Sequence, residues 1–344
     1  MRDKQWHLKF LDVQRAHTIT KGKGVIVAVV DTGVDPHPDL RRNLLPGINV
    51  MPGRSGTGQQ DDHGHGTGMA GLIAGHGRGS AGVLGIAPES KVLPVKDQTT
   101  DDLGDGTTTA AGITWAAAHA AKVINVSQAT APTSSLEEAI ETAAANDAVV
   151  VAGTGNRPKY LSMGYPAAIS GVLAVGAVDQ SGKYASFSVP GDQVQLCAPG
   201  DEMESTGLGG KYRIGRGTSD STAIVSGAAA LVRARFPQLT APQVIERLTS
   251  TATDIGPPGR DDECGFGVVN IVKALTAPAP GGGSASASAS ASPTADSAPG
   301  GPTSGAGPAP ESKSNTGAVV AGVGGGVVVL GALVAFLLLR RRRT

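Results

Sequence analysis

Residues 1–275 alternate short, almost continuous apolar runs with longer alanine-rich segments. The apolar runs are rich in β-branched residues, which predicts strands buried on both faces at 25–30, 92–96, 123–127, 148–152 and 172–178. The alanine-rich segments predict helices at 107–121, 134–146, 221–236 and 241–251. This alternation is typical of the α/β fold class, with a mainly parallel sheet and helices on both faces. In such sheets, functional side chains gather at the carboxyl ends of the strands.

The pattern changes after residue 275. Residues 276–315 consist almost entirely of Pro, Ala, Ser and Gly, and they predict a disordered spacer because they offer little apolar surface to offset the entropy of ordering. Residues 316–339 carry no charge and are long enough, at about 1.5 Å per residue, to cross a hydrocarbon core of about 30 Å. A buried core helix is the alternative, but the predicted spacer separates the run from any core against which it could pack. We therefore expect a folded domain over 1–275, a transmembrane helix over 316–339 and a basic tail over 340–344.

Four consecutive arginines, residues 340–343, predict the orientation of this span. Positive charge beside a span favours the cytoplasmic side, so the tail is expected in the cytoplasm and the folded domain outside it, on a single-pass protein of the cell membrane. The first ten residues, MRDKQWHLKF, contain no apolar segment that would direct export. Either a signal segment is missing from this sequence, or the protein is tail-anchored with its domain in the cytoplasm. The second option would leave the arginines outside, so the first is favoured.

Charge and cysteine content narrow the function classes. Lys and Arg total 29, as do Asp and Glu, so the formal net charge is +0 and we expect no nucleic-acid partner. The two cysteines, Cys197 and Cys264, exclude a disulfide scaffold and a cysteine-rich zinc module. Whether they pair with each other is left open by the sequence.

Three polar residues stand at the ends of predicted elements. Asp31 directly follows the run VIVAVV, His65 precedes a small-residue segment, and Ser219 precedes a long alanine-rich segment. Each alone is an ordinary turn or cap residue. Together they are the parts of an acyl-transfer triad, because a serine hydroxyl needs an imidazole to take its proton and a carboxylate to orient that imidazole. Asn156, at another strand end, could donate a hydrogen bond to a developing oxyanion, as could the backbone N–H groups of a helix starting at Ser219.

Three motifs that contain these residues resemble those of subtilisin-like serine proteases, in the same Asp, His, Ser order. They are VAVVDTGVDPHPDL, HGHGTGMAGLIAG and GRGTSDSTAIVSGAAAL, and the resemblance spans about residues 5–275. It implies a subtilisin-like three-layer fold. It also implies that Asp31 is the orienting acid, His65 the general base and acid, and Ser219 the nucleophile. Asn156 and the Ser219 N–H would form the oxyanion hole. His65 rather than His63 fits, because Gly66 and Thr67 follow it directly.

The same resemblance suggests substrate-binding residues. The segment VINVSQAT is similar to the family's strand that pairs with extended substrate. Residues 152–154 match a second substrate-facing strand, and Gly164 matches a glycine at the base of the specificity pocket. These matches assign Ser127, Gln128, Ala152, Gly153, Thr154 and Gly164 to substrate binding. Gly164 would leave room in the specificity pocket for a large apolar substrate side chain. Gln128 and Ala129 depart from the family pattern, which usually has Leu and Gly at these two positions.

Two acidic residues need separate interpretation. Asp220 follows the nucleophile, where the family usually has Met or another apolar residue. We expect it to be tolerated, because adjacent helix residues point about 100° apart and an acid in the first turn favours a helix start. Asp39 matches a calcium ligand of some subtilisins, but residues 78–81 lack the oxygen ligands that would complete the site. We assign no metal ligand and no cofactor.

The complete layout resembles the mycosins, membrane-anchored proteases associated with type VII secretion. This resemblance implies proteolysis of protein or peptide substrates outside the cytoplasm, with a type VII secretion membrane complex as partner. The alternative is a non-catalytic scaffold that stabilises such a complex. A degenerate enzyme is a third reading, which the presence of Asp31, His65, Ser219 and Asn156 disfavours.

Overall fold

The computed structural model describes residues 1–100 and 103–278. Its strands are β1 (Ile26–Asp31), β2 (Ile48–Asn49), β3 (His76–Arg78), β4 (Ala81–Leu84), β5 (Lys91–Lys96), β6 (Val123–Val126), β7 (Val149–Gly153), β8 (Leu173–Val178), β9 (Val194–Pro199), β10 (Met203–Thr206) and β11 (Tyr212–Gly215). Seven of them form one sheet in the order β2-β5-β1-β6-β7-β8-β9, and every pair in it is parallel. The predicted mainly parallel α/β sheet is therefore confirmed.

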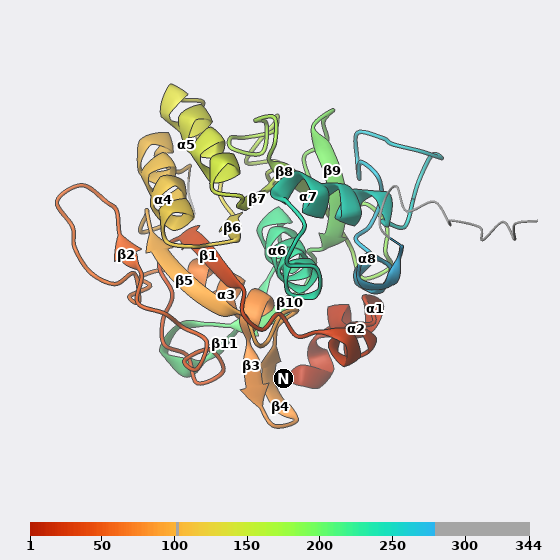
Figure 1. Cartoon of the computed structure of the whole chain (residues 1–344), viewed down its shortest axis with the longest axis horizontal. Coiled ribbons are helices and arrows are strands. Elements are labelled where there is room, and N and C mark those ends of the chain that lie inside the picture. The colour runs from red at the N-terminus through yellow and green to blue at the C-terminus, as the bar shows by residue number, and fades with distance from the viewer. Residues whose placement is uncertain (101–102, 279–344) are drawn as a thin grey trace, which may run out of the picture. The chain divides into compact units, whose positions relative to one another are not determined.

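Helices cover both faces of the sheet (Figure 1). They are α1 (Trp6–Phe10), α2 (Val13–Ile19), α3 (His65–Ala74), α4 (Gly106–Ala118), α5 (Ser134–Ala145), α6 (Thr218–Arg235), α7 (Ala241–Ser250) and α8 (Ile271–Thr276), with short 3-10 turns at Arg2–Lys4 and Leu208–Gly210. Alternate side chains of β1 point to opposite faces: Val27 and Val29 pack with α3 and α6, whereas Ala28 and Val30 pack with α4 and α5. The result is a three-layer core built from strands that are apolar on both faces.

An antiparallel hairpin, β10 and β11, lies against α3. The Ser205 hydroxyl donates to the Gly68 carbonyl at 2.5 Å, and the Thr206 hydroxyl donates to the Thr67 carbonyl at 2.6 Å. Helix α6 begins at Thr218, three residues after β11 ends at Gly215 and three residues earlier than the sequence pattern predicts. The hairpin therefore connects the helix that begins with His65 to the helix that carries Ser219.

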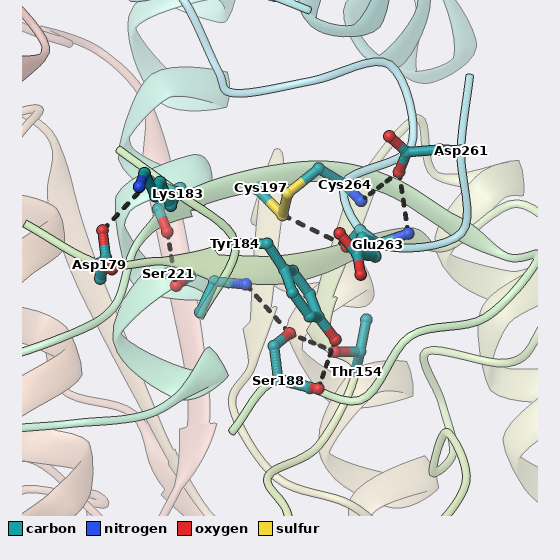
Figure 2. The surroundings of a disulfide bond; sticks show 12 residues. Thr154, Asp179, Lys183, Tyr184, Ser188, Cys197, Ser221, Asp261, Glu263 and Cys264 are labelled. Carbon is teal, nitrogen blue, oxygen red and sulfur yellow. Dashed lines mark hydrogen bonds between the residues drawn. A yellow bond between two sulfur atoms is a disulfide. The ribbon is translucent and has the colours of Figure 1, made fainter. Parts of the chain in front are cut away.

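A disulfide bond joins Cys197 of β9 to Cys264, 67 residues further along the chain (Figure 2). The backbone N–H groups of Glu263 and Cys264 donate to the Asp261 carboxylate at 2.9 and 2.8 Å, which fixes the turn that carries Cys264. The pairing that the sequence leaves open is thus settled, and it ties the last segment of the described chain to the sheet.

Across residues 1–100 and 103–278, none of the helices combines the length and the apolar character that crossing a membrane requires. The predicted transmembrane helix over 316–339, the tail over 340–344 and all but the first residues of the spacer over 276–315 lie outside the described residues.

Candidate active site

Strand β1 ends at the point where the order of the sheet reverses. The chain continues from β1 to β5 on one side and later to β6 on the other, so β1 lies between them. In open α/β sheets this reversal opens a crevice beyond the carboxyl ends of the strands. Asp31 is the last residue of β1, and its side chain is fully buried at this crevice.

His65 is the first residue of α3 and faces Asp31. Its Nδ1 lies 2.8 and 2.9 Å from the two carboxylate oxygens of Asp31, a geometry in which Nδ1–H donates and Nε2 is left to act as a base. Burial lowers the pKa of His65, but the charge and hydrogen bond of Asp31 outweigh this and raise the pKa above its ordinary 6.5. The carboxylate thus orients the imidazole and stabilises its protonated form.

A buried carboxylate holds the start of α3 in place. Asp61 accepts hydrogen bonds from the backbone N–H of Gly64 at 2.7 Å and from the Thr67 backbone and hydroxyl at 2.9 and 2.6 Å. Thr32, next to Asp31, donates to Asp61 at 2.8 Å. Burial alone would raise the pKa of Asp61, but these hydrogen bonds bring it below its ordinary value. Asp61 was not predicted from the sequence: it lies four residues before the start of α3, whereas the N-cap position is Gly64.

Ser219 lies in the first turn of α6, half-buried beside the same crevice. Its hydroxyl donates to the Ser127 carbonyl at 2.9 Å, and the Ser127 hydroxyl donates to the Ser219 carbonyl at 3.1 Å. Within the described chain no hydrogen bond joins Ser219 to His65, but both residues line one cavity of about 120 Å³. In the absence of substrate, the hydrogen bond between a nucleophile and its base is often long, and it tightens only when substrate binds.

Asn156 follows β7 and lines this cavity as well. Its Oδ1 accepts from the backbone N–H of Thr218 at 2.9 Å, which fixes the orientation of the amide group. A side chain at Gly217 would place its Cβ 3.0 Å from Asn156 Nδ2, so a glycine leaves room for the amide there. Asn156 is therefore held next to the nucleophile, with its donor group turned away from Thr218.

The residues predicted to bind substrate separate into two groups. Ser127, Gln128 and Gly153 line the cavity together with His65 and Ser219. Ala152 and Thr154 are fully buried inside the sheet, and neither they nor Gly164 lines it. The cavity also takes in five residues that were not predicted to bind substrate: Ala129, Gly155, Lys159, Tyr160 and Thr218.

Gln128 connects the cavity to a buried polar cluster behind it. Its Nε2 donates to the Thr109 hydroxyl at 2.8 Å and to the carboxylate of Asp97, a residue that follows β5 directly. Burial raises the pKa of Asp97 to about 7, although hydrogen bonds from Thr109 and Gln128 oppose this. The amide nitrogen of Gln128 is thus satisfied from within the protein, whereas its buried Oε1 has no hydrogen-bond partner in the described chain.

The two unusual acids have clear partners. The oxygens of Asp39 accept from Arg78 Nε at 3.0 Å, the Val83 N–H at 2.9 Å and the Tyr212 hydroxyl at 3.0 Å. Asp220 is buried and faces Arg213 across 3.9 Å. Burial raises the pKa of Asp220, and Arg213 counteracts this effect. Asp220 is therefore part of the interior beside the site, a position that the helix geometry considered from the sequence does not reveal.

A larger groove, of about 850 Å³, lies at the opposite edge of the sheet. Lys23, Ile26 and Lys91, at the amino ends of β1 and β5, are among its lining residues, and none of the candidate catalytic residues borders it. The chemistry is therefore assigned to the smaller cavity, where acid, imidazole, hydroxyl and amide groups meet.

A buried acid, an oriented imidazole and a serine at a helix start, at the carboxyl edge of a parallel sheet, define a serine hydrolase. The Subtilase family model matches residues 22–267. The chain is 39% identical over 267 residues to subtilisin BL of Lederbergia lenta, covering 77% of this chain and 96% of that protein. It is also 39% identical over 254 residues to a thermostable alkaline protease of Halalkalibacterium halodurans, covering 74% and 69%.

Solved structures of mycosins are similar as well. MycP1 from Mycobacterium smegmatis matches with a TM-score of 0.69 and 32% identity, covering 80% of this chain and 85% of that one. MycP3 from the type VII (ESX-3) secretion system matches with a TM-score of 0.69 and 32% identity, covering 79% and 88%. The chain belongs to the subtilase family and is a serine-type endopeptidase.

Proposed function

We propose that the chain hydrolyses peptide bonds through an acyl-enzyme formed on Ser219. The observation that carries this proposal is the pair of Asp31–His65 contacts at 2.8 and 2.9 Å, beside a cavity that Ser219 also lines. A substrate in that cavity would compete with the Ser127 carbonyl for space, and the Ser219 hydroxyl would turn to His65 Nε2.

The chemical steps follow from this geometry. As Ser219 Oγ bonds to the peptide carbonyl carbon, its proton passes to His65 Nε2. The carbonyl oxygen becomes an oxyanion that Asn156 Nδ2 and the Ser219 N–H stabilise. His65 then gives the proton to the leaving amine as the C–N bond breaks. A water molecule, deprotonated by His65, attacks the ester, and the acid product leaves with Ser219 restored.

Two serines with a single residue between them provide a matched pair of variants. Ser219→Ala should lower the kcat of the full-length protein towards a denatured protein substrate by about 10⁴-fold or more. Ser221→Ala removes a hydroxyl that bonds the Ala198 carbonyl at 2.9 Å inside the fold, and should retain activity. Equal activity of the wild type and Ser219→Ala would refute the proposed nucleophile.

We further propose that the domain acts outside the cytoplasm, tethered by residues 316–339, and works beside a type VII secretion complex as mycosins do. Support comes from the uncharged run at 316–339, the four arginines behind it and the similarity to MycP1 and MycP3. The full chain should sediment with membranes and a chain ending at residue 315 should not. Protease added to intact cells should degrade the domain only if it lies outside.

The scaffold function is the second candidate, favoured by the same mycosin similarity. Ser219→Ala separates it from catalysis. Full secretion by cells carrying Ser219→Ala would support a scaffold, whereas an uncleaved substrate accumulating in those cells would show that proteolysis is needed.

A further inference from the structure

Asp220 and Arg213 form a charged pair that the proposed mechanism does not use. Asp220 directly follows the nucleophile and is 2% exposed, and Arg213 lies on β11 with 27% of its side chain exposed. Arg213 Nη1 and Asp220 Oδ1 are 3.9 Å apart, too far for a hydrogen bond. Neither atom has another hydrogen-bond partner in the described chain. The pair therefore interacts through charge across a short gap.

Two glycines make space for this pair. A methyl group at Gly68, in the first turns of α3, would collide with the Arg213 guanidinium. A methyl group at Gly215 would collide with the Asp220 carboxylate and lie 2.9 Å from Arg213 Nη2. Neither glycine has a positive φ, so the requirement is room and not backbone conformation. The side chains of Arg213 and Asp220 thus fill the space that the two glycines leave beside α3 and α6.

The pair lies close enough to His65 to act on its charge. His65 and Arg213 both border a second cavity of about 280 Å³. Burial lowers the pKa of His65, Asp31 raises it most, and of the next two influences Arg213 lowers it and Asp220 raises it. Two partners 3.9 Å apart therefore influence His65 in opposite directions, and each opposes the effect of the other.

We propose that Arg213 and Asp220 are positioning residues for His65. The Asp220 carboxylate favours the imidazolium that forms when the nucleophile gives up its proton, and Arg213 limits this effect so that the imidazole is neutral before the reaction. The inference rests on His65 acting as the general base proposed above. It gives a role to the acid that stands where related proteases have an apolar side chain.

Other charged and titratable groups also face His65. Asp31 does so from β1, and His63 does so from the preceding loop with its ring centroid 6.4 Å away. Lys159 and Lys211 each line one of the two cavities that His65 borders. These groups are the same in every variant below, so they do not change the direction of the expected shifts.

The test is a double-mutant cycle in the full-length protein. Catalysis needs neutral His65, so activity rises with pH through the pKa of this residue. Asp220→Asn keeps the shape of the side chain but removes its negative charge, so Arg213 acts on His65 without an opposing charge. The acid limb of the plot of kcat/KM against pH should move to lower pH by about 0.5–1 pH unit. Arg213→Gln removes the positive charge and should move the acid limb to higher pH, by less than the shift of Asp220→Asn, because the buried Asp220 carboxylate binds a proton more readily without Arg213. In the double variant the acid limb should lie near its wild-type pH. Arg213→Lys keeps the positive charge, so its acid limb should also lie near that of the wild type.

Nuclear magnetic resonance of ¹³C-labelled histidine gives the pKa of His65 without relying on activity, with the signal assigned by its loss in His65→Ala. The same opposite shifts are expected there. Opposite shifts without any hydrolysis would uphold the pair and refute the proposed mechanism. The inference would be overturned if both single variants kept the wild-type pH profile of kcat/KM and the wild-type pKa of His65 and only kcat fell. The pair would then serve packing alone.

Discussion

The two halves of the site are held in different ways. In the acid–base half, Asp31 and His65 stand at the ends of β1 and α3, almost fully buried, and already make the contacts that catalysis needs. In the nucleophile half, Ser219 bonds to the Ser127 carbonyl and Asn156 bonds to the Thr218 N–H. The first half is preorganised by burial, whereas the second half is open to the cavity and must exchange internal hydrogen bonds for substrate contacts.

The hairpin of β10 and β11 holds the two halves of the site in place relative to each other. It is bonded to α3 through Ser205 and Thr206 and leads directly into α6. A shift of α6 would therefore strain the contacts that fix the histidine helix. Arg213 and Asp220 lie between the two halves, where Arg213 packs against Gly68 of α3 and Asp220 belongs to α6.

The largest effect on activity after loss of the nucleophile is expected in the acid–base half. Asp31→Asn keeps the shape but removes the charge that supports the imidazolium and selects its tautomer, and kcat should fall by about 10⁴-fold. Asp61→Asn is the matched control, because Asp61 holds α3 without touching the imidazole. It should mainly lower the free energy of unfolding. A fall of less than tenfold for Asp31→Asn would contradict the preorganised acid–base half.

A smaller effect is expected from the oxyanion donor of the nucleophile half. Asn156→Ala should lower kcat by about 10²- to 10³-fold with little change in KM, because the donor acts on the transition state. Asn156→Asp retains an acceptor for the Thr218 N–H but lacks the Nδ2 donor. Both variants should therefore lose activity. If Asn156→Asp were fully active, Asn156 would serve only to position α6.

The smallest effect on activity is expected far from both halves. Replacing Cys197 and Cys264 by alanine opens a link across 67 residues and should lower the free energy of unfolding by about 2–4 kcal/mol. Neither cysteine lines the cavity, so kcat at 25 °C should stay within about twofold of the wild type while the protein is folded. Urea unfolding and peptide hydrolysis on the same samples check this. Lost activity with unchanged stability would connect the disulfide to the site.

Much of the sheet was predictable because its strands are apolar on both faces, as in VIVAVV before Asp31. The three motifs likewise located Asp31, His65 and Ser219, since each stands where a strand or helix pattern begins or ends. Local patterns contain no information on pairs distant in the chain. The Cys197–Cys264 bond, the contacts of β10 with α3 and the position of Arg213 beside Asp220 all depend on the tertiary fold.

Ala152 and Thr154 illustrate the same limit at the site. The family resemblance assigns them to a substrate-facing strand but does not say where their side chains point. Both side chains are fully buried, and of residues 152–154 only Gly153 lines the cavity. Side chains of a strand alternate between faces, and sequence alone does not say which face a given residue takes when both are covered.

The most direct test of an activated Ser219 is labelling of the folded full-length protein with a fluorophosphonate, followed by mass spectrometry of the modified peptide. We expect one adduct, on Ser219, that is retained in Ser221→Ala and lost in Ser219→Ala and His65→Ala. An adduct on another residue, or none on the folded wild type, would contradict an activated serine at the start of α6.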